Sequence, residues 1–78
     1  MSHDVFKNHR GPYTLVASRP MKTKPNFWRT EVVARDVDSE DVEALAQMFM
    51  TDPRDTIADI SVWSEREEQF VTLLRRTR

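Results

Sequence analysis

Three stretches of the chain have the composition and alternation of half-buried β-strands. The first runs from Tyr13 to Arg19 and stops at Pro20, which has no amide proton to donate to a sheet ladder. The second runs from 27 to 37 and is predicted to pair with the first as a hairpin, and the third runs from 57 to 63. The side of the second stretch that is expected to face the core carries Trp28, Thr30, Val32 and Ala34.

A single helix is predicted between the second and third strands. Its apolar positions have the spacing i, i+3, i+4 and i+7 of one helix face, and the pattern ends before Pro53. Asp38 and Ser39 precede it, and their side-chain oxygens are expected to cap the free amide groups of the first turn. The apolar stripe consists of Val42, Leu45, Ala46 and Phe49. The outer face, directed to solvent, carries Glu40, Asp41, Glu43 and Gln47.

The last segment carries two conflicting patterns. Phe70 to Leu74 has the β propensity of a fourth strand. Ser64 to Glu67 has the form of a helix capping box, with acidic residues early and arginines late in the segment. We favour a strand, because a hairpin through residues 65–69 completes a four-stranded sheet. The predicted class is α+β, an antiparallel sheet of three to four strands with one helix packed on one face, in the order ββαββ or, alternatively, ββαβα.

The length of 78 residues predicts one domain, because a fold of this size has no room for a second core. Residues 1–12 are polar and are expected to form a mobile N-terminal arm, with a single α+β domain over residues 13–78. The chain has no cysteine, which excludes disulfides and thiolate sites. It also shows no signal-peptide core and no apolar stretch long enough to span a membrane, so we expect a cytoplasmic protein that does not bind membranes.

The composition argues against an enzyme. The chain has one glycine, which excludes the glycine-rich loops that cradle phosphates. Both histidines, His3 and His9, lie in the N-terminal arm, where no nucleophile or base is fixed beside them. We therefore expect no catalytic residues, no metal, no cofactor and no small-molecule substrate.

The net charge of −1 conceals two blocks of opposite sign. Residues 1–35 hold seven basic and two acidic side chains, whereas residues 36–68 hold two basic and eleven acidic ones. Aromatic residues accompany the basic turn, a composition that can neutralise and stack single-stranded nucleic acid. Trp28 belongs to this group although it also lies on the predicted core side. The candidate residues for nucleic-acid binding are Lys22, Lys24, Trp28 and Arg29.

The acidic block predicts a different kind of partner, a protein or ribonucleoprotein complex with a basic surface. Trp63 lies on the polar side of the third strand, where a tryptophan can anchor a protein interface or cover the sheet edge. The sequence leaves open whether the protein also forms a homodimer through a sheet edge. The candidate partner-binding residues are Glu40, Asp41, Glu43, Gln47 and Trp63.

Residues 34–39, Ala-Arg-Asp-Val-Asp-Ser, lead into the acidic amphipathic helix with Leu45 and Phe49 and resemble a stretch of the small phage-encoded anti-CRISPR inhibitors of type I systems. The resemblance implies a non-catalytic, stoichiometric inhibitor that docks on a CRISPR surveillance complex and blocks target DNA. An acidic helix face is compatible with this role, because it would compete with nucleic acid for lysines and arginines. The alternative hypothesis is a small nucleic-acid-binding regulatory protein that uses the basic turn and the adjacent strand.

Overall fold

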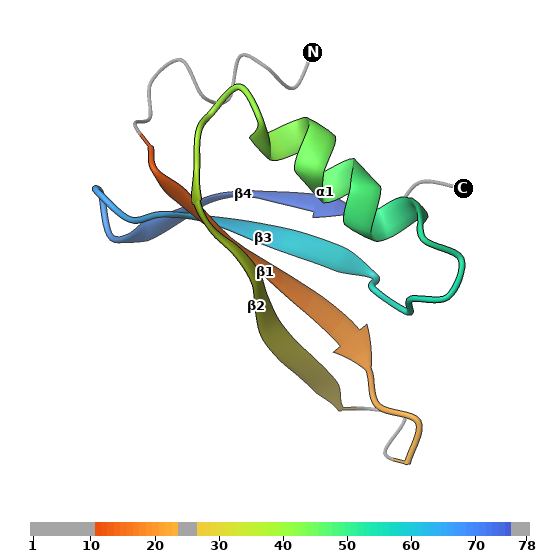
Figure 1. Cartoon of the computed structure of the whole chain (residues 1–78). Helices are drawn as coiled ribbons and strands as arrows, with labels where there is room; N and C mark the ends of the chain where they lie inside the picture. Colours follow the sequence, from red (N-terminus) through yellow and green to blue (C-terminus); the bar gives the residue numbers. More distant parts are fainter. Residues whose placement is uncertain (1–10, 24–26, 76–78) are drawn as a thin grey trace.

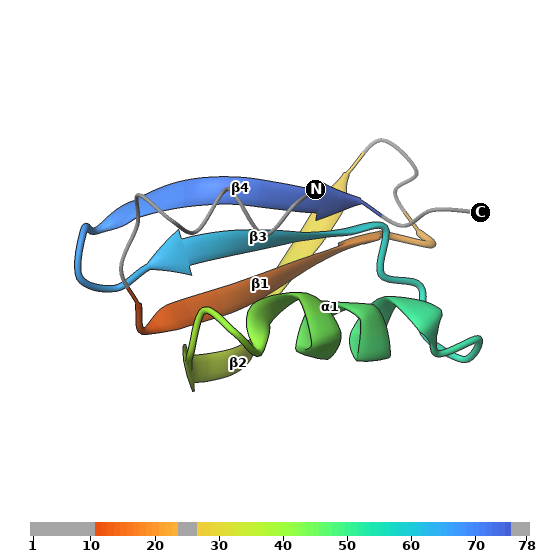
Figure 2. The ribbon, with the colours of Figure 1, turned by 90° about the horizontal axis from the view of Figure 1, so that it is seen from above.

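The computed structural model describes residues 11–23 and 27–75 of the chain. They form an antiparallel sheet, and the helix lies against one of its faces (Figure 1 and Figure 2). The strands lie in the order β2-β1-β3-β4. The elements are β1 (Tyr13–Pro20), β2 (Trp28–Val37), α1 (Val42–Thr51), β3 (Asp59–Ser64) and β4 (Gln69–Arg75). The predicted α+β class and the order ββαββ are confirmed.

The core lies between α1 and the two central strands of the sheet. In β3, alternate residues are fully buried, as the two-residue period of a strand requires. The predicted helix stripe is confirmed, since Val42 and Ala46 are fully buried while Leu45 and Phe49 pack half-buried against the core. The buried apolar residues are Tyr13, Leu15, Ala17, Val37, Val42, Ala46, Met50, Ile57, Ile60 and Val62.

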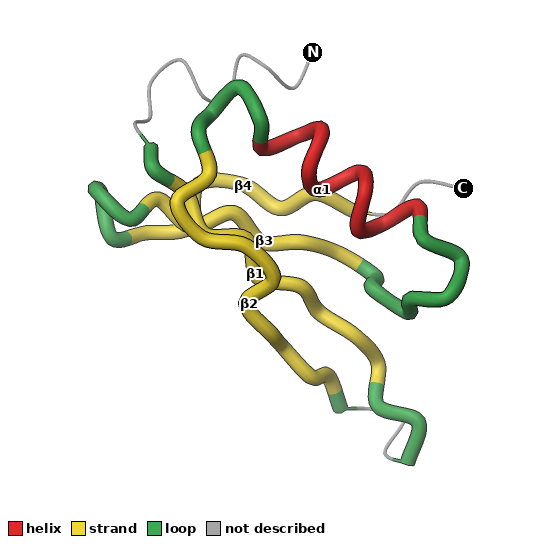
Figure 3. Tube along the Cα trace, in the orientation of Figure 1, coloured by secondary structure: helices red, strands yellow, loops and turns green. Residues whose placement is uncertain are grey.

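The predicted core side of β2 is wrong for Trp28, Thr30 and Val32, which are exposed, and right for Ala34, which packs against the core. Val32 pairs with Val16, which points away from α1, and Trp28 shares that side of the sheet. The two side chains are 42% and 58% exposed, respectively. A register shift between Leu15 and Val16 gives β2 an extra residue, so that Ala34, opposite Leu15, returns to the helix side. The far half of the β1–β2 hairpin also extends beyond α1, which leaves it uncovered (Figure 1 and Figure 3).

The helix begins later than its predicted capping residues. Residues 38–41 form a turn in which the Asp41 amide donates a hydrogen bond to the Asp38 carbonyl at 2.9 Å. Asp41 immediately precedes the first helical residue, and its side chain makes no capping hydrogen bond. The predicted capping by Asp38 and Ser39 is therefore wrong, because the intervening turn separates them from the first helical amides. Their side chains remain exposed to solvent.

The capping box predicted at Ser64 belongs to a turn between two strands and not to the start of a helix. Ser64 is fully buried, and its Oγ accepts a hydrogen bond from the Glu67 amide at 3.1 Å, the same contact that caps a helix. The chain then turns at Glu68, whose φ is 53°, and returns as β4 beside β3. The strand interpretation is therefore confirmed over residues 69–75, while residues 76–78 lie outside the described part of the chain.

Replacing Glu68 by glycine is expected to stabilise the protein by about 1 kcal/mol, because glycine adopts a left-handed backbone without the steric penalty of a Cβ. For a domain of this size the midpoint of thermal unfolding should rise by about 4–8 °C, which circular dichroism can measure. Glu67→Gly is the matched control, since Glu67 does not have a positive φ and should gain nothing. Equal stabilisation by both variants would assign the effect to the lost carboxylate and contradict the backbone explanation.

The N-terminal arm was predicted to end at Pro12, but Pro12 is hydrogen-bonded to the domain. The Pro12 carbonyl accepts a hydrogen bond from the Glu65 amide at 3.0 Å, which ties the residue before β1 to the turn after β3. The rest of the predicted arm, residues 1–10, lies outside the described residues. Within the described part of the chain, no helix has the length and apolar character needed to cross a membrane.

Candidate interaction surfaces

The sheet face opposite α1, here called the open face, carries a band of apolar side chains. Val16 of β1 and Trp63 of β3 point to this face because their neighbours along each strand point to the core. The strand register places Val32 of β2 opposite Val16 and Phe70 of β4 opposite Trp63. The apolar residues of the open face are Val16, Trp28, Val32, Trp63, Phe70 and Leu73. An apolar band on the side of the sheet away from the helix is a candidate contact surface.

Trp63 is held in place by an aromatic contact across the sheet. Its ring centroid lies 4.8 Å from that of Phe70, and the two planes meet at 75°, an edge-to-face arrangement. Trp63 is half-buried, whereas Phe70 is 59% exposed. Because Trp63 lies on the open face, it does not share a surface with the outer side of α1. The structure therefore separates Trp63 from the acidic helix residues with which the sequence grouped it.

The Glu65 carboxylate joins two acidic segments that lie far apart in the sequence. Its Oε2 accepts hydrogen bonds from Thr14 Oγ1 at 3.0 Å and from the Asp36 amide at 3.2 Å. These contacts bring the turn after β3 against residues 36–41, the end of β2 and the turn that leads to α1. The exposed or half-buried acidic residues of these two segments, here called the acidic end, are Asp36, Asp38, Glu40, Asp41, Glu65, Glu67 and Glu68.

A groove at the acidic end combines apolar and acidic lining residues. Its apolar lining consists of Val37, Ala44, Leu45 and Met48, and its acidic lining consists of Asp36, Asp38 and Asp41. Arg35 is the basic residue on the groove. A lysine or arginine side chain suits such a lining, since its aliphatic stem packs on apolar surface while its charge meets carboxylates. In the described part of the chain, no group of three or more histidines and acidic residues has the geometry to hold a metal ion.

The residues predicted to form the outer, acidic face of the helix differ in their exposure to solvent and in their contact with the groove. Asp41 lines the groove, and Glu40 and Gln47 are exposed as expected. Glu43 is half-buried, because it lies three residues before the buried Ala46 on the same side of the helix. Its assignment to the outer face is therefore wrong in part.

Two groove residues were missed as binding candidates in the sequence. Asp36 and Asp38 line the groove, although the sequence pattern places them only at a helix start. The signal that pointed to them was the accumulation of carboxylates before the helix. Their approach to apolar Leu45 and Met48 depends on the turn that precedes α1.

The pKa of the Tyr13 hydroxyl is sensitive to the charge of Glu67, a residue of the acidic end. The Tyr13 side chain is fully buried, and this burial, with a smaller contribution from the charge of Glu67, raises the pKa of its hydroxyl above the ordinary value of 10.0. A raised pKa in the folded state means that the tyrosine contributes stability below about pH 10, which is lost as the pH rises through the folded pKa. Tyr13 is the one tyrosine of the chain, so an ultraviolet titration of tyrosinate should show a midpoint above that of the urea-unfolded protein.

The Glu67→Gln variant separates the two causes of this shift. Its titration midpoint should move down but stay above that of the unfolded protein, because burial is the larger cause. Coincident titrations of the folded and unfolded wild-type protein would contradict the prediction.

The end of the β1–β2 hairpin carries the residues predicted to bind nucleic acid. Lys22 and Arg29 are exposed there, and they line a shallow site together with Arg19. Trp28 is exposed beside Phe27, which is itself 60% exposed. This exposure removes the objection that Trp28 belongs to the core. Lys24 lies outside the described residues.

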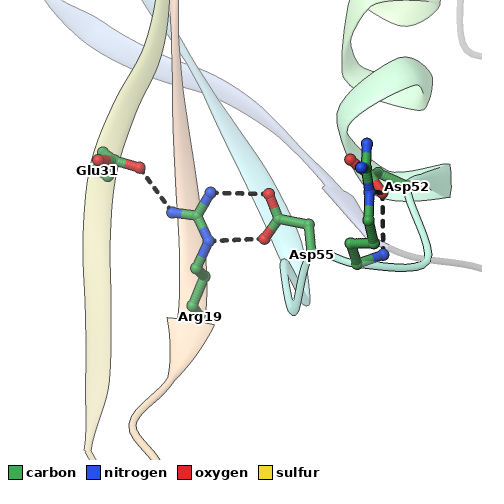
Figure 4. Close-up of polar contacts among 5 residues, drawn as sticks. Arg19, Glu31, Asp52 and Asp55 are labelled. Atoms are coloured by element: carbon green, nitrogen blue, oxygen red, sulfur yellow. Dashed lines mark hydrogen bonds and ion pairs between the residues drawn. The ribbon is translucent and has the colours of Figure 1, made fainter.

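Arg19 is neutralised by two carboxylates near the hairpin end (Figure 4). Its guanidinium donates to both carboxylate oxygens of Asp55, at 2.8 and 3.0 Å, and to Glu31 at 2.8 Å. The hydrogen bonds from Arg19 lower the pKa of the Asp55 carboxyl below its usual value. Arg19 therefore adds no net positive charge to the hairpin end. Among the described residues there, the positive charge comes from Lys22 and Arg29.

Residues 34–39, on which the expected relation to anti-CRISPR inhibitors rests, form the end of β2 and the start of the turn before α1. Four of them, residues 35–38, line the groove of the acidic end. Comparison of the chain with protein-family models, curated proteins and solved structures found no match.

Proposed function

We propose that the protein is a non-catalytic, protein-binding inhibitor that docks its acidic end on a basic, nucleic-acid-binding surface of a nucleoprotein complex. This is the role that the resemblance to anti-CRISPR inhibitors implies. The observation that carries the proposal is the groove in which Asp36, Asp38 and Asp41 accompany apolar Leu45 and Met48. A lysine or arginine of the partner fits this groove, and its capture removes a cation that the partner needs for binding nucleic acid.

The charge distribution around the groove supports the same partner. Seven acidic side chains form the acidic end, while Arg35 and Arg66 are the basic residues of the same two segments. A field of this sign accelerates the approach of a basic surface and repels free nucleic acid. The absence of cysteine from the chain favours the cytoplasm as the place of this encounter.

Neutralising two groove carboxylates tests the proposal. Tagged wild-type protein and the Asp38→Asn/Asp41→Asn variant would be incubated with nuclease-treated lysate and with a purified type I CRISPR surveillance complex. The substitutions preserve side-chain shape, and Asp41 makes no capping hydrogen bond that could be lost. The Glu67→Gln/Glu68→Gln variant is the matched control, since it removes the same charge from the acidic end but does not touch the groove lining.

The groove assignment predicts at least tenfold weaker capture of a basic nucleoprotein by the Asp38→Asn/Asp41→Asn variant than by the wild type and the control. Binding of the wild type should also prevent the nucleoprotein from retaining its target DNA. Equal losses in both variants would make the contact a diffuse charge effect and remove the groove from the proposal. Failure of the wild type to retain any basic nucleoprotein would overturn the proposed function itself.

A second candidate function is binding of single-stranded nucleic acid by the hairpin end, which the exposure of Trp28 and Phe27 favours. Exposed aromatic rings can stack on bases while Lys22 and Arg29 contact phosphates. This function predicts binding to single-stranded DNA or RNA that weakens steeply with added salt and is lost in Lys22→Glu/Arg29→Glu. Salt-independent binding, or none, would exclude it.

A further inference from the structure

The outer edge of β4 is the least protected edge of the sheet. In the strand order β2-β1-β3-β4, β4 pairs with β3 on one side, and no described strand lies on its other side. The five residues from Phe70 to Leu74 include no charge and no proline. Natural edge strands are usually blunted by charges, proline or bulges, because their unpaired backbone groups can recruit another strand.

The opposite edge of the sheet is better protected than β4, whose pairing with β3 has one register shift, beside Val71. β2 carries charged residues along its length and shows register shifts at two places in its pairing with β1. Such irregularities and charges hinder the addition of a further strand. The charged residues of β2 are Arg29, Glu31, Arg35 and Asp36.

We infer that β4 is a homodimer interface, in which a second copy of the chain pairs antiparallel with β4 and continues the sheet. A two-fold axis at Leu73 would place Leu73 opposite its own copy on the open face and Thr72 opposite Leu74 on the helix side. Thr72 and Leu74 then point to the same face, because they pair with the core-facing Val62 and Ile60 of β3. In this register Arg75 lies opposite Val71 rather than another arginine, so no like charges from residues 71–75 meet across the interface.

The dimer also explains the apolar character of the open face near β4. Leu73 is 43% exposed in the single chain, and Phe70 lies on the same face beside Trp63. Pairing along β4 joins this band to the equivalent band of the second copy. Strand pairing over about five residues buries less surface than a standard interface of about 1,600 Å², so the expected dimer is weak, with dissociation in the micromolar range.

Charge substitutions at the two-fold axis test this interface. Sedimentation velocity of the full chain, from about 1 µM to 1 mM, should show a concentration-dependent dimer for the wild type. Leu73→Lys and Leu73→Glu should each weaken association at least tenfold, because like charges then lie directly opposite each other. An equimolar mixture of the two variants should recover the dimer at low salt. Thermal unfolding of each variant checks that the exposed substitution leaves the fold intact.

Val32→Lys is the matched control, since Val32 is as exposed as Leu73 and lies on the same face but on the protected edge. It should leave the dimer intact. Equal disruption by Val32→Lys would indicate face-to-face packing of two sheets and overturn pairing along β4. A wild-type chain that stays monomeric, or a variant mixture that does not associate, would overturn the dimer. These outcomes are independent of the acidic groove, so they do not decide the proposed function.

Discussion

Replacing Leu15 by alanine is expected to lower the free energy of unfolding by about 2–5 kcal/mol. Leu15 is fully buried in β1, where it lies opposite Ala34 of β2 and Val62 of β3. The shortened side chain leaves a cavity beneath α1 that its neighbours on both strands cannot fill without moving. A chain of this length has a total stability of about 4–12 kcal/mol, so this one substitution removes a large part of it.

Urea titration followed by circular dichroism measures this loss, with Leu73→Ala as the control. Leu73 is the same residue type in the same sheet but is 43% exposed on the open face. At a protein concentration that keeps the chain monomeric, its truncation should cost less than about 1 kcal/mol. Similar losses in the two variants would mean that the core does not lie between the sheet and α1 as described.

The second large effect is expected at Ser64. Ser64→Ala should lower the free energy of unfolding by about 1–2 kcal/mol, because the Glu67 amide loses the Oγ acceptor of the buried Ser64 in a partly buried hydrogen bond. This hydrogen bond closes the turn that sends the chain back as β4. We therefore expect hydrogen exchange to accelerate in β4 more than in β1, a difference that mass spectrometry can resolve by segment.

Ser61→Ala is the matched control for Ser64, since Ser61 lies on the same strand but is half-buried on the other face. Its removal should change the stability by less than about 0.5 kcal/mol. If Ser64→Ala and Ser61→Ala change the free energy of unfolding equally, the Oγ contact of Ser64 does not stabilise the turn.

The conflict in the last segment shows why local patterns can mislead about a secondary-structure type. Ser64 makes the hydrogen bond expected of a helix cap, but the same contact also closes a tight turn. The residues that follow, from Phe70 to Leu74, decide the outcome because they pair with β3 and cover its outer edge. Local capping is worth about 1 kcal/mol, and the ladder and burial of a whole strand outweigh it.

The sequence by itself determined the first four elements, their order and the class of the fold, whereas the type of the last element was decided by its pairing with β3. The alternation in β3 and the helical spacing from Val42 to Phe49 depend on neighbours along the chain, so they can be read without the tertiary structure. The excess of carboxylates before the helix also indicated which part of the chain is acidic.

Only the tertiary structure decided which faces are covered and which side chains meet. Alternation assigns Trp28 and Val32 to one side of β2, but the register with β1 and the reach of α1 determine that this side is exposed. Likewise, Glu65 meets the Asp36 amide across the sheet, which a pattern along the chain cannot show. The physical reason is that a strand has two faces and two edges with equivalent backbones, and only packing against other elements distinguishes them.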